Sequence, residues 1–196
     1  MEKDSMTTNS SALDVKLQLN IILKENNSLA ARMDYSQLPF LITAINSANR
    51  IFIIAAGRSG FSMRSAAMRL MHLGLNVFFV GDTTTPAIGI GDLLIAASGS
   101  GTTSTIVKAA EKSVSAGATV IALSTNVSSP LALMAKHIIL IPAAEKQDHG
   151  GNISSQYAGS LFEQYLLLLT DAVFQSLWKM QETPAEELWK RHANME

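Results

Sequence analysis

Two short turns rich in serine and glycine are the segments of this sequence best suited to bind a ligand. The first is Gly57-Arg58-Ser59-Gly60, and the second is Ser98-Gly99-Ser100-Gly101-Thr102-Thr103. Glycine lets a backbone approach a ligand closely, and serine and threonine hydroxyls donate hydrogen bonds. Where such a turn opens a helix, the free N–H groups of the first helical turn also face the ligand. Together these features favour an anion such as phosphate.

Both turns directly follow apolar runs that have the character of buried strands. Five such runs alternate with segments of helical periodicity. Continuous apolar and β-branched runs are typical of strands covered on both faces, as in a parallel sheet with crossover helices. The expected strands are residues 50–56, 76–80, 93–97, 118–123 and 137–141, and the expected helices between them are residues 62–73, 103–115 and 130–136.

This alternation predicts an α/β fold: a three-layer αβα sandwich around a five-stranded, parallel, doubly wound sheet. If the strand order is 2-1-3-4-5, the first and third strands flank the point where the order reverses. Both turns would then face one crevice at the carboxyl edge of the sheet. We expect residues 1–196 to form a single domain, with N-terminal helices over 12–47, an α/β core over 50–141 and C-terminal helices over 157–191. Residues 1–11 are expected to form a mobile tail, and residues 142–155 a long polar loop.

Other interpretations of the two turns are available. Glycine and serine also make ordinary strand-to-helix turns and helix N-caps. A dinucleotide site is disfavoured, because the first turn lacks G-x-G-x-x-G and the second strand is followed by Gly81-Asp82-Thr83. A Walker loop is excluded, since G-x-x-x-x-G-K-[ST] does not occur.

The composition narrows the possible function classes. The 196 residues carry a formal net charge of −1, which gives no electrostatic signature of nucleic-acid or anionic-membrane binding. There is no cysteine, and the four histidines lack metal-ligand spacing, so we expect no metal or other cofactor. The polar start is not a signal peptide, and the apolar stretch 165–178, interrupted by Asp171 and Gln175, is too short to span a membrane. We therefore expect a cytoplasmic protein.

Both turns and several later stretches resemble the SIS (sugar isomerase) domain and, more narrowly, the 6-phospho-3-hexuloisomerase family. The matching stretches are AGRSG at 56–60, MRLMHLG at 68–74, VGDTTTP at 80–86, SGSG at 98–101, GSLFEQ at 159–164 and RHANME at 191–196. The last two are the most specific, because all SIS proteins share the serine-rich turns. The sequence departs from the family pattern at Tyr157-Ala158, where Pro-Met is expected, and in the loop His149-Gly150-Gly151-Asn152.

The resemblance implies interconversion of arabino-hex-3-ulose 6-phosphate and fructose 6-phosphate without a metal or organic cofactor. It also implies a homotetramer with sites at subunit boundaries. By position, it assigns substrate phosphate binding to Ser59, Ser98, Ser100 and Thr103, and the catalytic carboxylate to Glu163. The other residues of the turns, which are Gly57, Arg58, Gly99, Gly101 and Thr102, are expected to make weaker substrate contacts.

Glu163 is the candidate base for moving a carbonyl from C3 to C2. This reaction takes a proton from C2 and returns one to C3 through a cis-enediolate, and one carboxylate on one face can do both. The alternative is structural: Ser160-x-x-Glu163 is also a capping-box pattern, in which Glu163 would only satisfy the start of a helix.

His192 is the second catalytic candidate, because a histidine titrates near neutrality and can move protons between the substrate oxygens. The alternative is a solvated histidine in a terminal tail, and a tail held in place would reach a neighbouring subunit. His72 is expected to be structural, in the last helical turn before Gly74.

Two other functions share most of these residues. One is a different SIS isomerase, acting on arabinose 5-phosphate or sedoheptulose 7-phosphate. The other is a sugar-phosphate sensor, since SIS domains also occur in transcription regulators. The segment before Arg50 is too short for a helix-turn-helix module in addition to its expected helices, which disfavours the sensor.

Overall fold

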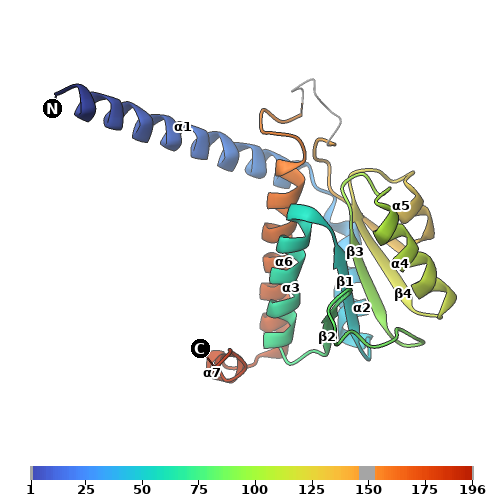
Figure 1. Cartoon of the computed structure of the whole chain (residues 1–196). Helices are drawn as coiled ribbons and strands as arrows, with labels where there is room; N and C mark the ends of the chain where they lie inside the picture. The colour runs from blue at the N-terminus through green and yellow to red at the C-terminus, as the bar shows by residue number, and fades with distance from the viewer. Residues whose placement is uncertain (1, 146–152, 196) are drawn as a thin grey trace.

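The centre of the fold is a parallel sheet with the strand order β2-β1-β3-β4-β5 (Figure 1). The computed structural model describes residues 2–145 and 153–195. The strands are β1 (Ile51–Ala55), β2 (Val77–Phe79), β3 (Leu93–Ala97), β4 (Thr119–Ser124) and β5 (His137–Leu140). All neighbouring strands pair in parallel, so the predicted five-stranded, doubly wound sheet of order 2-1-3-4-5 is confirmed.

Helices cover both faces of the sheet, which makes the predicted three-layer sandwich. Successive β1 residues point to opposite faces: Ile51 and Ile53 enter one buried apolar cluster, and Phe52 and Ile54 enter the other. On the first face lie α2 (Leu38–Ser47), α3 (Gly57–His72) and α6 (Ser160–Gln181), and on the second lie α4 (Ser104–Ser115) and α5 (Pro130–Met134). Figure 1 shows α3 and α6 on one side of the strands and α4 and α5 on the other.

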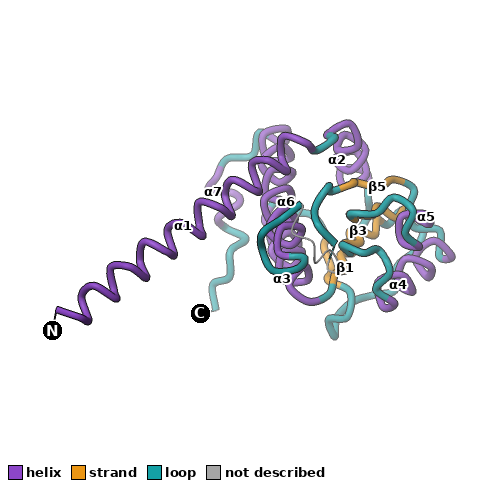
Figure 2. The backbone as a smooth tube through the Cα atoms, turned by 90° about the horizontal axis from the view of Figure 1, so that it is seen from above, coloured by secondary structure: helices purple, strands orange, loops and turns teal. Residues whose placement is uncertain are grey.

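The first helix, α1 (Glu2–Arg32), is longer than expected and projects from the body (Figures 1 and 2). Residues 2–11, expected to form a separate tail, instead continue the helix. No glycine or proline occurs before residue 39, so nothing in the backbone interrupts helix propagation from the amphipathic part. Near its end, Leu29 is fully buried, whereas Leu13, Val15 and Leu17 are each more than half exposed.

The parallel helices α3 and α6 connect the two ends of the molecule. A short 3-10 turn (Tyr35–Gln37) precedes α2, and the last helix, α7 (Ala185–Trp189), follows α6. Arg58 in the first turn of α3 contacts Glu163 in the first turn of α6. At the opposite end of α3, the backbone carbonyl of His72 accepts a hydrogen bond from Arg191, just beyond α7. With 16 residues, α3 separates these two regions by about 24 Å.

Candidate active site

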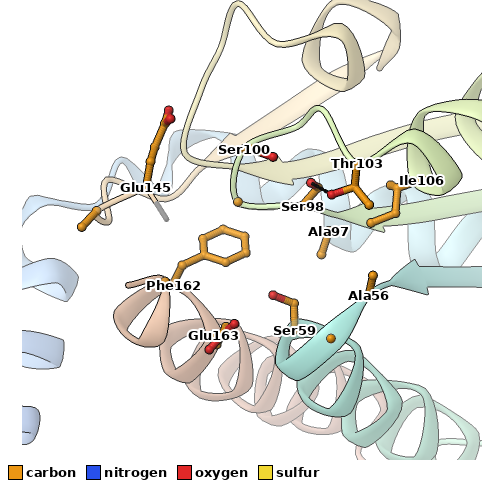
Figure 3. Close-up of a pocket in the computed structure, with 14 residues that line it drawn as sticks. Ala56, Ser59, Ala97, Ser98, Ser100, Thr103, Ile106, Glu145, Phe162 and Glu163 are labelled. Carbon is orange, nitrogen blue, oxygen red and sulfur yellow. Dashed lines mark hydrogen bonds between the residues drawn. The ribbon is translucent and has the colours of Figure 1, made fainter. Parts of the chain in front are cut away.

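The two serine/glycine turns and the start of α6 enclose one cavity of about 180 Å³ at the carboxyl edge of the sheet (Figure 3). One turn follows β1 and the other follows β3, which are adjacent strands on either side of the strand-order reversal. The predicted convergence of both turns on one crevice is thus confirmed. The cavity is lined by Ala56, Gly57, Ser59, Ala97, Ser98, Gly99, Ser100, Thr103, Ile106, Ala144, Glu145, Gly159, Phe162 and Glu163.

The second turn presents hydroxyl groups whose protons are only partly used within the protein. Ser98 Oγ lies 3.0 Å from Thr103 Oγ1, so one of these two hydroxyls donates to the other and one proton stays available. Ser100 Oγ accepts from both the N–H and the hydroxyl of Thr102, at 3.3 and 2.9 Å. Its own proton is therefore free to donate to a ligand.

Ser59 adds a fourth hydroxyl from the opposite wall. Its residue is 7% exposed, and its side chain has no hydrogen-bond partner among the described residues. Figure 3 shows the Ser59 oxygen directed into the space between the turns. The turns also open α3 and α4, in which the helical N–H groups before Gly60 and Ile106 have no intrahelical acceptor. Hydroxyls and helix N-termini together suit a phosphate group.

Backbone geometry explains the glycines of the second turn. Gly101 has φ +63°, and a Cβ there would overlap the Ser129 side chain. The Gly99 carbonyl accepts hydrogen bonds from Ser124 Oγ at 3.0 Å and from Thr125 Oγ1 at 2.8 Å, which hold the turn on β4. Gly57 and Gly99 line the cavity, whereas Gly101 and Thr102 do not line it and instead shape the turn.

Glu163 is buried beside this cavity, with 7% of its side chain exposed. Its Oε2 lies 2.9 Å from Nη1 of Arg58, a residue whose side chain is 60% exposed. The same Nη1 donates to Ser160 Oγ at 3.0 Å. Arg58 does not line the cavity itself, but with Glu163 it lines two adjacent hollows of about 200 and 300 Å³. The carboxylate therefore stands between the hydroxyl-lined cavity and these hollows.

The capping-box interpretation of Glu163 is wrong. The residue at the N-cap of α6 is Gly159, with φ +81°, and no side chain caps the helix. The N–H of Ser160 donates to the Tyr157 carbonyl, and the Glu163 carboxylate pairs with Arg58. Because Glu163 does not satisfy the helix start, its burial at the cavity has no capping explanation.

The structure does not bring His192 near Glu163 within one chain. The His192 ring stacks on His72 with centroids 4.0 Å apart, at the far end of α3 (Figure 1 shows α7 and the C-terminus there). His72 is 3% exposed, as expected for a structural residue, and burial is the main reason that its pKa is lowered, with charge from His192 and Arg69 acting in the same direction. A catalytic role for His192 stays a prediction, and it requires a second copy of the chain.

Seven of the fourteen lining residues had no site role in the sequence analysis, among them Phe162 and Glu145. Phe162 is 2% exposed, and its ring packs beside Gly99. Glu145 follows β5 at the same edge, and its Oε1 lies 3.4 Å from the Thr125 hydroxyl. Its place shortly after the last strand was the available signal. The departure at 149–152 lies outside the described residues, and Tyr157, the other departure, is 89% exposed.

The described residues give no positive sign of a metal centre or a membrane span. Within residues 2–145 and 153–195, no three His, Asp or Glu side chains cluster in a way that could hold a metal ion. In the same part of the chain, no helix combines the length and apolar character needed to cross a bilayer.

The parallel α/β fold and the hydroxyl-lined pocket at its strand-order reversal are the features that the sequence resemblance to the SIS domain implied. The SIS domain model matches residues 44–168, which is more than half of the chain, and the chain therefore belongs to the SIS domain family. The sequence resemblance to this family is thereby confirmed.

The relatives narrow the similarity further. The chain is 55% identical over 183 residues to the 3-hexulose-6-phosphate isomerase of Mycobacterium gastri, covering 93% of this chain and 92% of that protein. It is 40% identical to the 3-hexulose-6-phosphate isomerase of Bacillus subtilis, covering 89% of this chain and 95% of that protein. A crystal structure from Methanococcus jannaschii, for which the same function was inferred, superposes with a TM-score of 0.79 at 32% identity, covering 91% of this chain and 99% of that one.

Proposed function

We propose that this protein is an isomerase that interconverts arabino-hex-3-ulose 6-phosphate and fructose 6-phosphate. The observation that carries the proposal is the buried Glu163 carboxylate beside a cavity lined by serine and threonine hydroxyls. Such a site has an anion anchor and a base next to each other, which a phosphorylated sugar with a migrating carbonyl requires. The names of the relatives from Mycobacterium gastri and Bacillus subtilis support the same substrate pair.

The phosphate of the substrate binds in the hydroxyl-lined cavity. Ser59, Ser100 and the free proton of the hydrogen-bonded Ser98–Thr103 pair donate to its oxygens, with the N–H groups that open α3 and α4. Gly57 and Gly99 allow close backbone approach, and Gly101 and Thr102 maintain the turn. The carbon chain then extends past Glu163 toward the hollows beside Arg58.

Glu163 acts as the proton carrier in both half-reactions. In the forward direction its carboxylate takes the C2 proton of the 3-ketose, and the electron pair of the C–H bond forms the C2=C3 double bond of the enediolate. The protonated carboxyl group then returns the proton to C3, while the hydroxyl proton on O2 moves to O3. One carbonyl and one hydroxyl exchange places, so no oxidant, reductant or water is consumed. Arg58 holds the carboxylate in place through the 2.9 Å ion pair.

His192 of a second copy is proposed to move the proton between O2 and O3 and to assist ring opening of fructose 6-phosphate in the reverse direction. A homotetramer is proposed for the same reason, since the single chain leaves His192 far from Glu163. The exposed apolar side chains of α1 support such an assembly. A single domain over residues 1–196 and a cytoplasmic location stay proposals from the sequence.

The test is direct conversion of hexulose 6-phosphate to fructose 6-phosphate by the purified protein, followed by a coupled assay for fructose 6-phosphate. Glu163→Gln keeps the shape of the side chain but removes the base, so kcat should fall by at least about 100-fold while fructose 6-phosphate still binds. Binding without turnover in the unmodified protein would instead indicate a sensor. Preference for arabinose 5-phosphate or sedoheptulose 7-phosphate in the same assay would indicate a different isomerase.

A further inference from the structure

The Glu25 carboxylate on α1 is saturated with hydrogen bonds from a loop beside the candidate active site. Its Oε1 accepts from the N–H and the hydroxyl of Ser155, at 2.8 and 2.7 Å. Its Oε2 accepts from Ser154 Oγ at 2.6 Å and from Gln156 Nε2 at 3.0 Å. Both oxygens therefore bind three consecutive loop residues, although Glu25 is about 130 residues away in the chain.

A second set of hydrogen bonds joins the same loop to α6 and returns to α1. Gln156 Oε1 accepts from Gln164 Nε2 at 2.7 Å. Gln164 Oε1 in turn accepts from Nδ2 of Asn26, the neighbour of Glu25, at 2.9 Å. Glu25, Gln156, Gln164 and Asn26 thus form a closed ring across α1, the loop and α6, which we call the Glu25 network.

The Glu25 network lies directly beside the residues proposed to do the chemistry. Gln164 follows Glu163 on α6, so it fixes the first turns of the helix that carries the base. Gln156 stands three residues before Gly159, whose backbone lines the cavity. Residues 153–159 contain no regular helix or strand. Side-chain hydrogen bonds to Glu25 therefore replace the backbone ladder that would otherwise hold this segment.

The charge of Glu25 is maintained by its partners. Partial burial alone would raise its pKa, but the hydrogen bonds from Ser154, Gln156 and Ser155 outweigh burial and lower the pKa from 4.5 to about 2. The side chain is consequently ionised throughout the neutral range, as an acceptor of four hydrogen bonds must be. The network is a permanent connection rather than a switch.

We propose that Glu25 is a positioning residue for the active site, which holds the 154–156 segment and the start of α6 so that Glu163 faces the bound sugar phosphate. This inference rests on the proposed function. Among the described residues, the hydrogen-bond partners of Glu25 are Ser154, Ser155 and Gln156, none of which lines the cavity, so its effect on catalysis passes through Gln156 and Gln164. Through Glu25, the long N-terminal helix α1 helps to position the active site.

The test compares Glu25→Gln with the unmodified protein by hydrogen–deuterium exchange and by steady-state kinetics. Exchange over residues 153–160 should become at least about tenfold faster, with little change in the central strands. The value of kcat should fall about tenfold with a smaller change in KM, because the phosphate anchor remains and the base is misplaced. The matched control is Glu111→Gln on α4, which removes one exposed carboxylate with no partner among the described residues and should behave like the unmodified protein.

A second variant keeps the test decisive if Glu25→Gln folds poorly. Gln156→Ala cuts the connection between Glu25 and Gln164 and should give the same fall in kcat. The double variant should lose less activity than expected if the losses of the two single variants were independent. Faster local exchange with kcat within twofold of the unmodified protein would overturn the positioning role, and so would unchanged exchange. Absence of turnover in the unmodified protein would instead refute the proposed function.

Discussion

At the scale of single residues, the Arg58–Glu163 pair sets the geometry of the proposed base. Glu163 is buried, and the ion pair at 2.9 Å comes from a guanidinium that is mostly exposed. Solvent screening makes such a pair worth only about 1 kcal/mol of folding free energy. Its proposed role in catalysis is orientation, because the same Nη1 also donates to Ser160 Oγ and so ties the carboxylate to the start of α6.

We predict that Arg58→Met lowers kcat at least about tenfold, because the Glu163 carboxylate loses its fixed position beside the cavity. Arg58→Lys should recover part of the loss, since it keeps the charge without the planar guanidinium. Steady-state kinetics on hexulose 6-phosphate measure both. The control is Arg69→Met, because Arg69 and Asp171 also join α3 to α6, at 3.5 Å and well away from the cavity. Equal losses in Arg58→Met and Arg69→Met would show that only helix packing matters.

The residue patterns predicted the position of the two serine/glycine turns better than they predicted the rest of the pocket. Ser59, Ser98, Ser100 and Thr103 follow strands directly, so their place at the carboxyl edge follows from strand order. Phe162 lies within the GSLFEQ stretch and Glu145 within the polar loop after the last strand, but neither position predicts a side chain in the pocket. The packing of α6 and of the loop after β5 brings both to the cavity. For Glu163, the sequence pattern also allowed a capping role. The N-cap at Gly159 and the contact with Arg58 exclude that role, and the catalytic role stays a prediction.

At the scale of elements, the second turn depends on one glycine. We predict that Gly101→Ala destabilises the protein by about 2–4 kcal/mol, because a side chain at φ +63° is strained and its Cβ overlaps Ser129. Gly81→Ala is the matched control: Gly81 also has positive φ but has open space around it, so the cost should be only about 1–2 kcal/mol. Denaturant unfolding measures both, and equal costs would contradict the steric explanation.

The connection from α1 to the 154–156 segment should also depend on pH. The folded-state pKa of Glu25 is about 2, below the ordinary value of 4.5, so its stabilising contribution is complete above pH 4.5 and is lost as the pH falls toward 2. We predict that the unmodified protein is more stable than Glu25→Gln by about 1–2 kcal/mol at pH 7 and that this gap narrows by pH 3. Thermal unfolding across this range measures it. Asp14→Asn, an exposed change on the same helix, should differ little in stability from the unmodified protein at every pH. If the stability difference between Glu25→Gln and the unmodified protein did not change with pH, the lowered pKa of Glu25 would be contradicted.

The elements themselves were largely predictable, because apolar runs and helical periodicity report burial. Right-handed crossovers allow more than one strand order, and the order assumed in the sequence analysis, 2-1-3-4-5, is the one found. The length of α1 was not predictable in the same way. Its first residues are polar and give no periodic signal, so propagation of an uninterrupted backbone decided its start.

At the scale of the whole molecule, two features favour an assembly of several copies over an isolated chain. One is the row of exposed apolar side chains on the projecting part of α1. The other is the separation of the two proposed catalytic residues by the length of α3. A sequence lists both residues without their distance, so only the fold shows that His192 and Glu163 need two copies of the chain to meet.

We predict that inactive variants complement each other if His192 acts on the site of a neighbouring subunit. Glu163→Gln and His192→Gln are each expected to be slow, and mixed assemblies combine the intact Glu163 of one protomer with the intact His192 of another. With random mixing in equal amounts, roughly a quarter of the sites carry both residues, so the rate should approach a quarter of that of the unmodified protein. Co-expression with two different affinity tags and purification of the mixed assembly allow this rate to be measured. A mixture no faster than the average of the two variants would refute the action of His192 on a neighbouring subunit, which its place on His72 at the far end of α3 requires.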